Sequence, residues 1–238
     1  MHPVIASLAP DLRIFKDEFE LVIEVVKLAD LKIRQQLESK GIFHIALTGG
    51  SLGTMVSDGL VARWNQEPGE YEGLHLWWGD ERFVPAMSTE RNSLSVLQKL
   101  AEDSPIHVHQ VMSSDSNVEL DIAAKRYNAD LFGIEMDLTL LGIGPDGHVA
   151  SLFPGQWDLN EERNAIGVAD SPKPPARRIS FSMAKINSSQ AIWMMASGAQ
   201  KREAIAKIIA RDESIPGVYV HGKEETLIFA DHAAVSGG

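Results

Sequence analysis

Residues 136–154 read MDLTLLGIGPDGHVASLFP, a short apolar run followed by a glycine-rich loop. The run at 136–141 is brief and ends at glycine, which predicts a buried strand. The loop holds three glycines, Asp146 and His148, and glycine permits the backbone to come close to a ligand. A histidine at the carboxyl end of a strand lies where open α/β sheets bind ligands. We therefore expect an active-site loop here.

Strand and helix patterns alternate along the rest of the chain. Apolar runs predict strands at 43–47, 74–78, 107–111, 178–183, 191–196 and 226–230. Capping boxes at Asp17 and Ser116 predict helices that end near Gly41 and Gly133, and helical spacing predicts others at 54–64, 92–100 and 200–210. This alternation predicts an α/β fold with a mostly parallel sheet. No linker or repeat divides the chain, so we expect one domain over 1–238, with a frayed tail at 232–238.

Composition excludes several classes of protein. The net charge is -11 at pH 7, whereas nucleic-acid binding usually needs a basic face. No stretch approaches ~20 consecutive apolar residues, so no membrane span is expected. Residues 1–5 lack the pattern of a signal peptide, and the absence of cysteine excludes disulfides and thiolate metal sites. We expect a cytoplasmic protein that binds neither nucleic acid nor membrane.

The segment Thr48-Gly49-Gly50-Ser51 lies between a predicted strand and a predicted helix. Free backbone N–H groups at such a helix start attract an anion, and Ser51 adds a hydroxyl. The segment is not a P-loop, because no Gly-Lys-Ser/Thr follows it. A plain strand-to-helix turn is the alternative. We favour a site for a phosphate-sized ligand.

His148 is either a structural histidine or a catalytic one. In a glycine-rich loop and close to Asp146, an imidazole with a pKa near ~6.5 can take a proton from water. Asp146 would then orient the ring, as a carboxylate does in hydrolytic triads. The spacing GxGxxG at 142–147 also matches the dinucleotide fingerprint. A proline and a histidine suit a pyrophosphate loop poorly, so we expect no nicotinamide or flavin.

Three cations are candidates for contact with an anionic substrate. Arg82, in the Asp-Glu-Arg run at 80–82, either aims at a substrate oxygen or belongs to a salt-bridged surface loop. Lys201 lies in the first turn of a predicted helix, where a bound anion would explain a cation and a solvated lysine is the alternative. Arg178 begins a predicted strand after the proline-rich loop at 171–175.

His107 and His109 alternate in a predicted strand and therefore share one face. Two ligands do not make a zinc site, and no third ligand is evident near them in the sequence. We interpret the pair as exposed and expect no metal site. Trp64, Trp77 and Trp193 are most simply core residues.

Four segments together resemble the 6-phosphogluconolactonase family, part of a larger group with glucosamine-6-phosphate deaminase/isomerase. They are 48–51, 79–84, 142–154, and Ser197-Gly198 with Lys201. The resemblance runs from the helix near Asp17 to the strand at Thr226. It implies a three-layer, Rossmann-like α/β fold with helices on both sides of the sheet. It also implies hydrolysis of 6-phospho-D-glucono-1,5-lactone to 6-phosphogluconate in the oxidative pentose phosphate pathway, without a metal or organic cofactor.

The resemblance also implies roles for individual residues. His148 is expected to act as general base on water, and Asp146 to hold the imidazole. The expected substrate- and phosphate-binding residues are Thr48, Gly49, Gly50, Ser51, Asp80, Arg82, Arg178 and Lys201. The sequence leaves open which of the three cations faces the phosphate and which the oxyanion. No interface pattern predicts an oligomeric state.

Two other functions are alternatives. The sister deaminases usually carry Asn-Glu-Pro where this chain reads SLFP at 151–154, and Asp-Glu-Tyr where it reads Asp-Glu-Arg at 80–82. Both departures favour the lactonase, although Asp80 could still serve as an isomerase's base. The second alternative is a non-catalytic sugar-phosphate sensor. Such regulators carry a helix-turn-helix module and a basic face, which this sequence lacks, and the chain retains His148.

Overall fold

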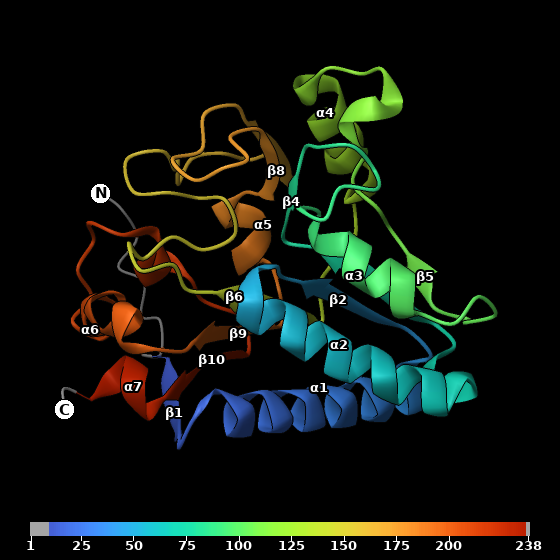
Figure 1. Cartoon of the computed structure of the whole chain (residues 1–238), viewed down its shortest axis with the longest axis horizontal. Helices are drawn as coiled ribbons and strands as arrows, with labels where there is room; N and C mark the ends of the chain where they lie inside the picture. Colours follow the sequence, from blue (N-terminus) through green and yellow to red (C-terminus); the bar gives the residue numbers. More distant parts are fainter. Residues whose placement is uncertain (1–9, 237–238) are drawn as a thin grey trace.

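A seven-stranded sheet lies at the centre of the structure, a computed structural model that describes residues 10–236. The strand order is β1-β10-β9-β6-β2-β3-β5, and neighbouring strands pair in parallel (Figure 1). The strands are β1 (Asp11–Phe15), β2 (Phe43–Leu47), β3 (Leu74–Trp78), β5 (His107–Val108), β6 (Leu138–Gly142), β9 (Ala191–Ala196) and β10 (Glu225–Asp231). The predicted α/β fold with a mostly parallel sheet is confirmed. Residues 1–5, which lack a signal-peptide pattern, lie outside the described part.

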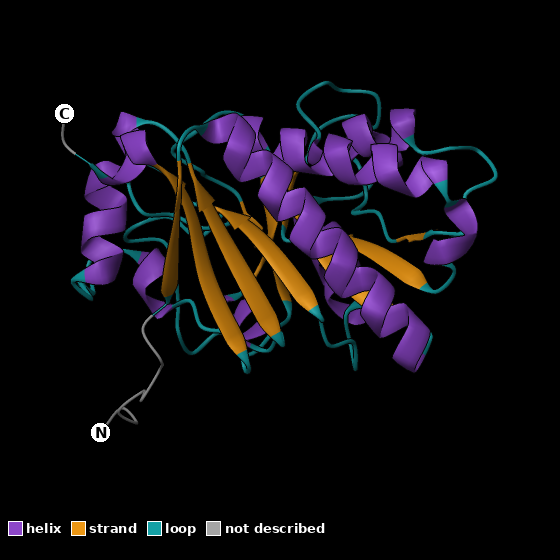
Figure 2. Cartoon of the chain, turned by 90° about the horizontal axis from the view of Figure 1, so that it is seen from below, coloured by secondary structure: helices purple, strands orange, loops and turns teal. Residues whose placement is uncertain are grey.

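Helices cover both faces of this sheet, and Figure 2 shows the strands fanned side by side with long helices crossing them. The α-helices are α1 (Glu18–Lys40), α2 (Gly50–Gln66), α3 (Asn92–Lys99), α4 (Leu120–Asp130), α5 (Met183–Asn187), α6 (Arg202–Ile209) and α7 (His232–Val235). Short 3₁₀ helices are η1 (Pro68–Tyr71), η2 (Ser114–Ser116), η3 (Ala199–Lys201) and η4 (Pro216–Tyr219). Over the described residues, no helix combines the length and apolarity needed to span a bilayer.

Alternate strand residues face two separate hydrophobic cores. Trp78 packs in the core that α1 and α2 cover, whereas Trp77 packs on the opposite face, which α4 to α7 cover. Both faces of the central strands are therefore apolar, as expected for a parallel sheet between two helical layers. Trp64, Trp77 and Trp193 are each no more than 3 % exposed, so their predicted place in the core is confirmed.

The helix predicted at Asp17 forms as its caps require. The Asp17 side chain accepts hydrogen bonds from two backbone N–H groups of the first turn of α1, and Gly41 ends the helix with φ 71°. The second predicted capping box is wrong. Ser116 lies in η2, and Glu119 precedes α4 without a side-chain cap, because the chain turns sharply at Asn117 (φ 54°) before the helix begins.

A second, antiparallel sheet lies beside the site. Its strands are β4 (Asp80–Arg82), β8 (Arg178–Phe181) and β7 (Ala165–Val168), in the order β4-β8-β7. The strand predicted at 178–183 ends at Phe181, and its expected alternation is absent because all four residues of β8 are buried. Ile179 and Phe181 pack in the core, and the alternate residues Arg178 and Ser180 have hydrogen-bond partners inside the protein. The sequence did not predict β4 and β7, which form only by pairing with β8.

The tail predicted to be frayed at 232–238 begins with an ordered helix instead, so that prediction is wrong for its first part. The Asp231 carboxylate accepts a hydrogen bond from the Ala234 N–H at 2.7 Å and so caps α7. Ala234 is fully buried in the core, which holds the helix against the sheet. Residues 237–238 lie outside the described part.

The parallel pairing brings the carboxyl ends of the central strands to one edge. The loops after β2, β6 and β9 start there with Thr48, Ile143 and Ser197. These strands are adjacent in the order β9-β6-β2, so three segments far apart in the sequence lie next to one another. Ligands of open α/β sheets bind at this edge.

Candidate active site

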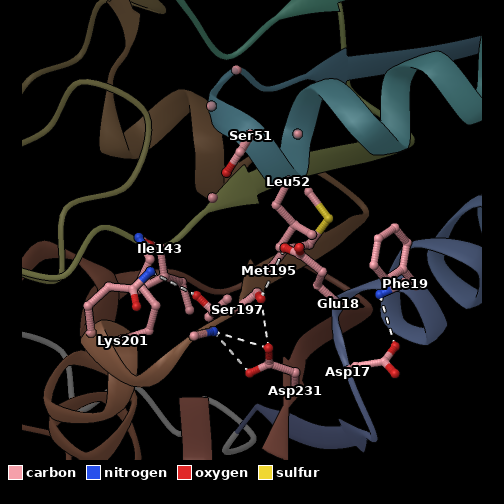
Figure 3. Close-up of a pocket in the computed structure, with 17 residues that line it drawn as sticks. Asp17, Glu18, Phe19, Ser51, Leu52, Ile143, Met195, Ser197, Lys201 and Asp231 are labelled. Atoms are coloured by element: carbon pink, nitrogen blue, oxygen red, sulfur yellow. Dashed lines mark hydrogen bonds between the residues drawn. The ribbon is translucent and has the colours of Figure 1, made fainter. Parts of the chain in front are cut away.

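A cavity of about 630 Å³ opens at the carboxyl ends of β2, β6, β9 and β10 (Figure 3). Its wall comes from the start of α1, the turn at 49–53, the end of β6, the loop at 195–201 and Asp231. In Figure 3, Ser51, Ile143 and Lys201 lie on one side, and Glu18 and Phe19 lie on the other. Lys201 is the one lysine or arginine in the described wall.

The turn at 48–51 presents backbone donors to this cavity. Gly50 adopts φ 77°, which suits glycine, and starts α2 behind Gly49, where no side chain caps the helix. The exposed Ser51 lines the cavity beside these N–H groups. Thr48 differs from its neighbours because its hydroxyl accepts a 3.4 Å hydrogen bond from the Gly142 N–H. The structure thus places Gly49, Gly50 and Ser51 at the cavity and Thr48 behind it, between β2 and β6.

Lys201 points into the same region. Its Nζ donates to the Ile143 carbonyl at 2.6 Å, and burial lowers its pKa, an effect that the nearby Lys173 strengthens. An ammonium group has three hydrogens, so one bond to a carbonyl leaves two donors for an anion. A bound anion would favour the charged form of this lysine.

Asp231 fixes the segment that carries Lys201. Its carboxylate accepts hydrogen bonds from the Ser197 hydroxyl at 2.7 Å and from the Gly198 N–H at 3.0 Å. The Glu18 carboxylate also lies 3.4 Å from the Ser197 hydroxyl. The end of β10 and the start of α1 therefore hold the loop after β9 in place.

His148 and Asp146 form a hydrogen-bonded pair, with 2.5 Å between Nδ1 and Oδ1. Gly144 makes room for the ring, because a Cβ at that position would lie 1.9 Å from His148 Nδ1. The Phe153 ring packs against the imidazole, with 4.6 Å between centroids. Among the described residues, Nε2 has no hydrogen-bond partner. The loop of 142–154 thus holds one face and one nitrogen of the imidazole and leaves the other nitrogen for water.

The charge of this pair is set by opposing effects. Burial lowers the pKa of His148, the Asp146 carboxylate raises it, and the Lys173 ammonium lowers it again. Burial alone would raise the pKa of Asp146, but its hydrogen bond to His148 and the nearby positive charges lower it overall. Both pKa values are lowered, which favours a neutral imidazole beside an ionised carboxylate, the combination that general-base chemistry uses.

Lys173 is the cation that the sequence did not single out. Its Nζ lies 3.4 Å from His148 Nδ1 and 3.7 Å from Asp146 Oδ1. The signal in the sequence was one lysine enclosed by prolines in the loop at 171–175, a stiff carrier for a charged side chain.

Asp80 is buried and engaged within the protein. Its Oδ2 accepts from the Ser151 hydroxyl at 2.6 Å, and its Oδ1 lies 3.4 Å from the Asn92 amide nitrogen. Arg178 Nη1 lies 3.8 Å from the same carboxylate. Asp80 therefore ties β4 to the loop after His148, and it is absent from the described wall of the cavity.

Glu81 has a structural function that the sequence did not reveal. Its carboxylate accepts hydrogen bonds from the backbone N–H groups of Asn92 at 2.7 Å and Ser93 at 3.0 Å, the first residues of α3. Arg91 Nε lies 3.7 Å away, and both side chains are nearly inaccessible. A buried carboxylate at a helix start is stabilised by the helix dipole and by this guanidinium.

Arg178 donates in several directions inside the protein and is 4 % exposed. Its Nε donates to the Pro175 carbonyl, and its Nη2 to the Lys173 and Pro174 carbonyls, at 3.0 to 3.2 Å. Its Nη1 reaches the Ser151 hydroxyl at 3.5 Å. This geometry favours a scaffold over contact with a substrate phosphate.

Arg82 lies outside the described wall of the cavity. Its Nη1 donates to the Glu90 carbonyl at 2.6 Å, and its Nε is buried without a partner among the described atoms. The sequence candidates therefore separate into two groups. Gly49, Gly50, Ser51 and Lys201 line the cavity, and the His148–Asp146 pair belongs to the loop that continues from its wall at Ile143. Thr48, Asp80 and Arg178 hold the surrounding loops, and Arg82 belongs to neither group.

The histidines of the predicted strand at 107–111 lie in a larger cluster. β5 ends at Val108, and the interpretation of the pair as exposed is wrong for His109, whose ring stacks on Trp77 with 3.8 Å between centroids. His75 lies beside both histidines, which the sequence did not show. Nevertheless, the described residues contain no group of His, Cys, Asp or Glu side chains arranged to hold a metal ion.

Comparison with known proteins places this site in context. Residues 16–229 match the model of a family described as glucosamine-6-phosphate isomerases/6-phosphogluconolactonase. A 6-phosphogluconolactonase of Streptomyces coelicolor is 35% identical, covering 95% of this chain and 94% of the relative. One of Mycobacterium tuberculosis is 34% identical, covering 96% and 98%. The solved structure of a Thermotoga maritima 6-phosphogluconolactonase has a TM-score of 0.79 and 26% identity, covering 93% of this chain and 99% of that one.

Proposed function

This chain belongs to the family of glucosamine-6-phosphate isomerases and 6-phosphogluconolactonases, and from that premise we propose that it hydrolyses 6-phospho-D-glucono-1,5-lactone to 6-phospho-D-gluconate. This reaction is a step of the oxidative pentose phosphate pathway. Relatives named 6-phosphogluconolactonase match nearly the whole chain, which supports the assignment. One observation supports it: the cavity wall contains the uncapped start of α2, Lys201 and Ile143, and Ile143 leads into the loop of the His148–Asp146 pair.

The 6-phosphate binds at the turn of 49–51 and Lys201. Uncapped N–H groups at the start of α2 donate to its oxygens, the helix dipole favours its charge, and Ser51 adds a hydroxyl. Lys201 supplies the charge-assisted hydrogen bonds. Binding energy at the phosphate orients the lactone ring toward His148. Thr48, Asp80 and Arg178 keep this arrangement without touching the phosphate.

His148 acts as general base. Its Nε2 takes a proton from water while the water oxygen bonds to C1 of the lactone, and the carbonyl electrons move to the oxygen as an oxyanion. When the carbonyl re-forms, the bond between C1 and the ring oxygen breaks, and His148 returns its proton to that oxygen. Asp146 holds the imidazole through Nδ1. A positioned base contributes about 10²–10⁴-fold to such a step.

A deaminase or isomerase activity on glucosamine-6-phosphate is the second candidate, because the matched family includes it. Asp80 is the residue that the sequence offers as a possible base for that chemistry. Asp80 is 6 % exposed and its oxygens face Ser151 and Asn92, so it lacks the access to substrate that a base needs. The geometry therefore favours the lactonase.

One assay tests the proposal. The protein is mixed with freshly generated 6-phosphogluconolactone, and in parallel with glucosamine-6-phosphate, in a chelator. We expect lactone loss well above the spontaneous rate and no ammonia from the amino sugar, and turnover in chelator would agree with the expected absence of a metal requirement. Ammonia release without lactone loss would replace the lactonase with a deaminase, and binding of phosphosugars without turnover would replace it with a sensor.

We propose the cytoplasm as the compartment. The sequence contains no cysteine, which suits a reducing environment. Some similar proteins are named chloroplastic, so fractionation of the source cells is the direct measurement.

A further inference from the structure

We propose that Lys173 is a positioning residue of the reaction centre, held against the His148–Asp146 pair as a fixed positive charge by Arg178. This role belongs to the proposed hydrolysis, and only its kinetic test depends on that function. Each of the three cations then has a different role. Lys201 binds the phosphate, Lys173 acts on the base His148, and Arg178 holds Lys173 in position.

Lys173 lies close to both members of the His148–Asp146 pair. Its ammonium lies within 4 Å of both members of the pair, 3.4 Å from His148 Nδ1 and 3.7 Å from Asp146 Oδ1. Asp146 therefore faces two cationic partners when His148 is protonated, and one when it is neutral. Lys173 compensates the carboxylate in the neutral state, which is the state that accepts a proton from water.

The proline loop that carries Lys173 is fixed at its backbone. Arg178 donates to three consecutive carbonyls, those of Lys173, Pro174 and Pro175. The Ser171 hydroxyl donates to the Lys173 carbonyl at 3.0 Å and accepts from the Lys173 N–H at 3.2 Å. A lysine side chain that only extended into water would not need a backbone held by so many bonds.

Arg178 also supports the histidine from the other side. Its guanidinium lies 5.7 Å from the centroid of the Phe153 ring, and this ring packs on the imidazole. Its Nη1 reaches Ser151, in the loop that follows His148. One buried guanidinium thus connects the loop that carries the base with the loop that carries Lys173.

The positive charge of Lys173 affects the pKa of His148. Lys173 lowers the pKa of His148, opposing the carboxylates of Asp146 and Asp80, which raise it. Removal of the lysine charge would let the imidazole gain a proton at higher pH. Because the Lys173 side chain is 40% exposed, salt screens part of its effect.

The test compares four variants with the wild-type protein. Lys173→Met removes the charge, Lys173→Arg keeps it, and Arg178→Lys keeps a charge but loses the planar fork that reaches three carbonyls. Lys125→Met, at an exposed position of α4, is the matched control for the change in net charge. Titration of His148 by NMR in the full chain is the readout that needs no turnover, and the pH profile of kcat/KM on the lactone is the second.

We expect Lys173→Met to raise the pH at which His148 titrates and to move the acid limb of kcat/KM in the same direction. Its deficit relative to wild type then grows as the pH falls and shrinks in high salt. Lys173→Arg and Lys125→Met should follow wild type. Arg178→Lys should shift the titration as Lys173→Met does.

Two results would overturn the inference. An unchanged His148 titration in Lys173→Met shows that the lysine does not act on the base, and a deficit that is uniform with pH shows a merely structural role. An unshifted titration in Arg178→Lys removes Arg178 from the proposal. A wild-type protein that does not hydrolyse the lactone defeats the proposed function instead, and the NMR titration still decides whether Lys173 acts on His148.

Discussion

The two ends of the central sheet carry similar side chains with different surroundings. At the carboxyl end, the loop of His148 follows Ile143, whose carbonyl accepts a hydrogen bond from the half-buried Lys201. At the amino end, His75 lies one residue after the start of β3, and the buried Lys185 donates to the Ile134 carbonyl. Burial lowers the pKa of both histidines, that of His75 to about 4, and it lowers the pKa of Lys185 to about 8.

The difference lies in the partners of the two imidazoles. His148 bonds to a carboxylate, and its loop continues from Ile143, which lines the cavity. His75 bonds to another imidazole, that of His109, at 2.9 Å, and its ring stacks on His107. Burial and a lowered pKa therefore do not by themselves distinguish a base from a core histidine. An acidic partner and an open nitrogen do.

The largest expected effect is the loss of His148. His148→Gln keeps a polar side chain but removes the base, so we expect kcat/KM to fall by about 10²–10⁴-fold. The free energy of unfolding at pH 7.5 should change little, because one nitrogen of the ring already faces open space. Lactone hydrolysis and urea unfolding of the same preparation measure both quantities.

His232→Gln is the control for this variant, since His232 is exposed at the start of α7 and is absent from the described wall of the cavity. It should keep wild-type kcat/KM. Wild-type turnover in His148→Gln would refute the contrast between the two ends of the sheet. His148, which has an acidic partner, would then contribute no more to catalysis than His75, which has none.

Lys201 and Lys185, which each donate to a backbone carbonyl, provide a smaller effect and a sharper comparison. Lys201→Met removes charge-assisted bonds to the phosphate, worth roughly 1.5–3 kcal/mol, so kcat/KM should fall by about 10- to 100-fold, chiefly through KM. Lys185→Met replaces a lysine that is 2 % exposed and leaves the Ile134 carbonyl without that donor. We expect it to lower the free energy of unfolding and to leave KM unchanged.

Substrate kinetics gives KM, and urea unfolding gives the free energy of unfolding, for both Lys201→Met and Lys185→Met. A raised KM in Lys185→Met, or an unchanged KM in Lys201→Met, would show that the cavity does not mark the functional end of the sheet.

Local pattern alone predicted much of the fold. Phe43–Leu47, Leu74–Trp78 and Ala191–Ala196 form strands at their predicted bounds, because each is an apolar run that the sheet buries on both faces. β4 and β7 were beyond such reasoning. They have three and four residues, and pairing with β8 stabilises them more than their own composition does.

The sequence predicted which loops lie at the strand ends better than it predicted which side chains contact a ligand. Glycine-rich turns at strand ends revealed the loops of Ser51 and His148, and the structure places them after β2 and β6 as the local sequence predicted. Arg178 has the sequence features of a phosphate ligand, yet its bonds run to carbonyls of the preceding loop. Whether a buried cation faces a ligand or the backbone depends on tertiary contacts that one-dimensional spacing does not encode.

The smallest expected effect is an acid-dependent loss of stability at the amino end. Folded pKa values of about 4 for His44 and His75 lie below the value of 6.5 for the free side chain. Between those two values the unfolded state binds more protons, so the free energy of unfolding falls as the pH drops from 6.5 toward 4 and levels off below it. Each histidine contributes at most about 1.4 kcal/mol per pH unit, and solvent exposure reduces this.

His75→Phe tests this expectation, because it keeps an aromatic ring in the stack and removes one titrating group. Urea unfolding at pH 7.5, 6 and 5 should show a shallower decline than in wild type, while His232→Gln declines as wild type does. Asp130 opposes the effect by favouring the charged form of His109, and Lys185 reinforces it by lowering the pKa of His44. An equal decline in His75→Phe and wild type would mean that carboxylates elsewhere govern the loss of stability in acid. The histidines at the two ends of the sheet would then differ in their hydrogen-bond partners, but protonation of His75 would not affect the free energy of unfolding.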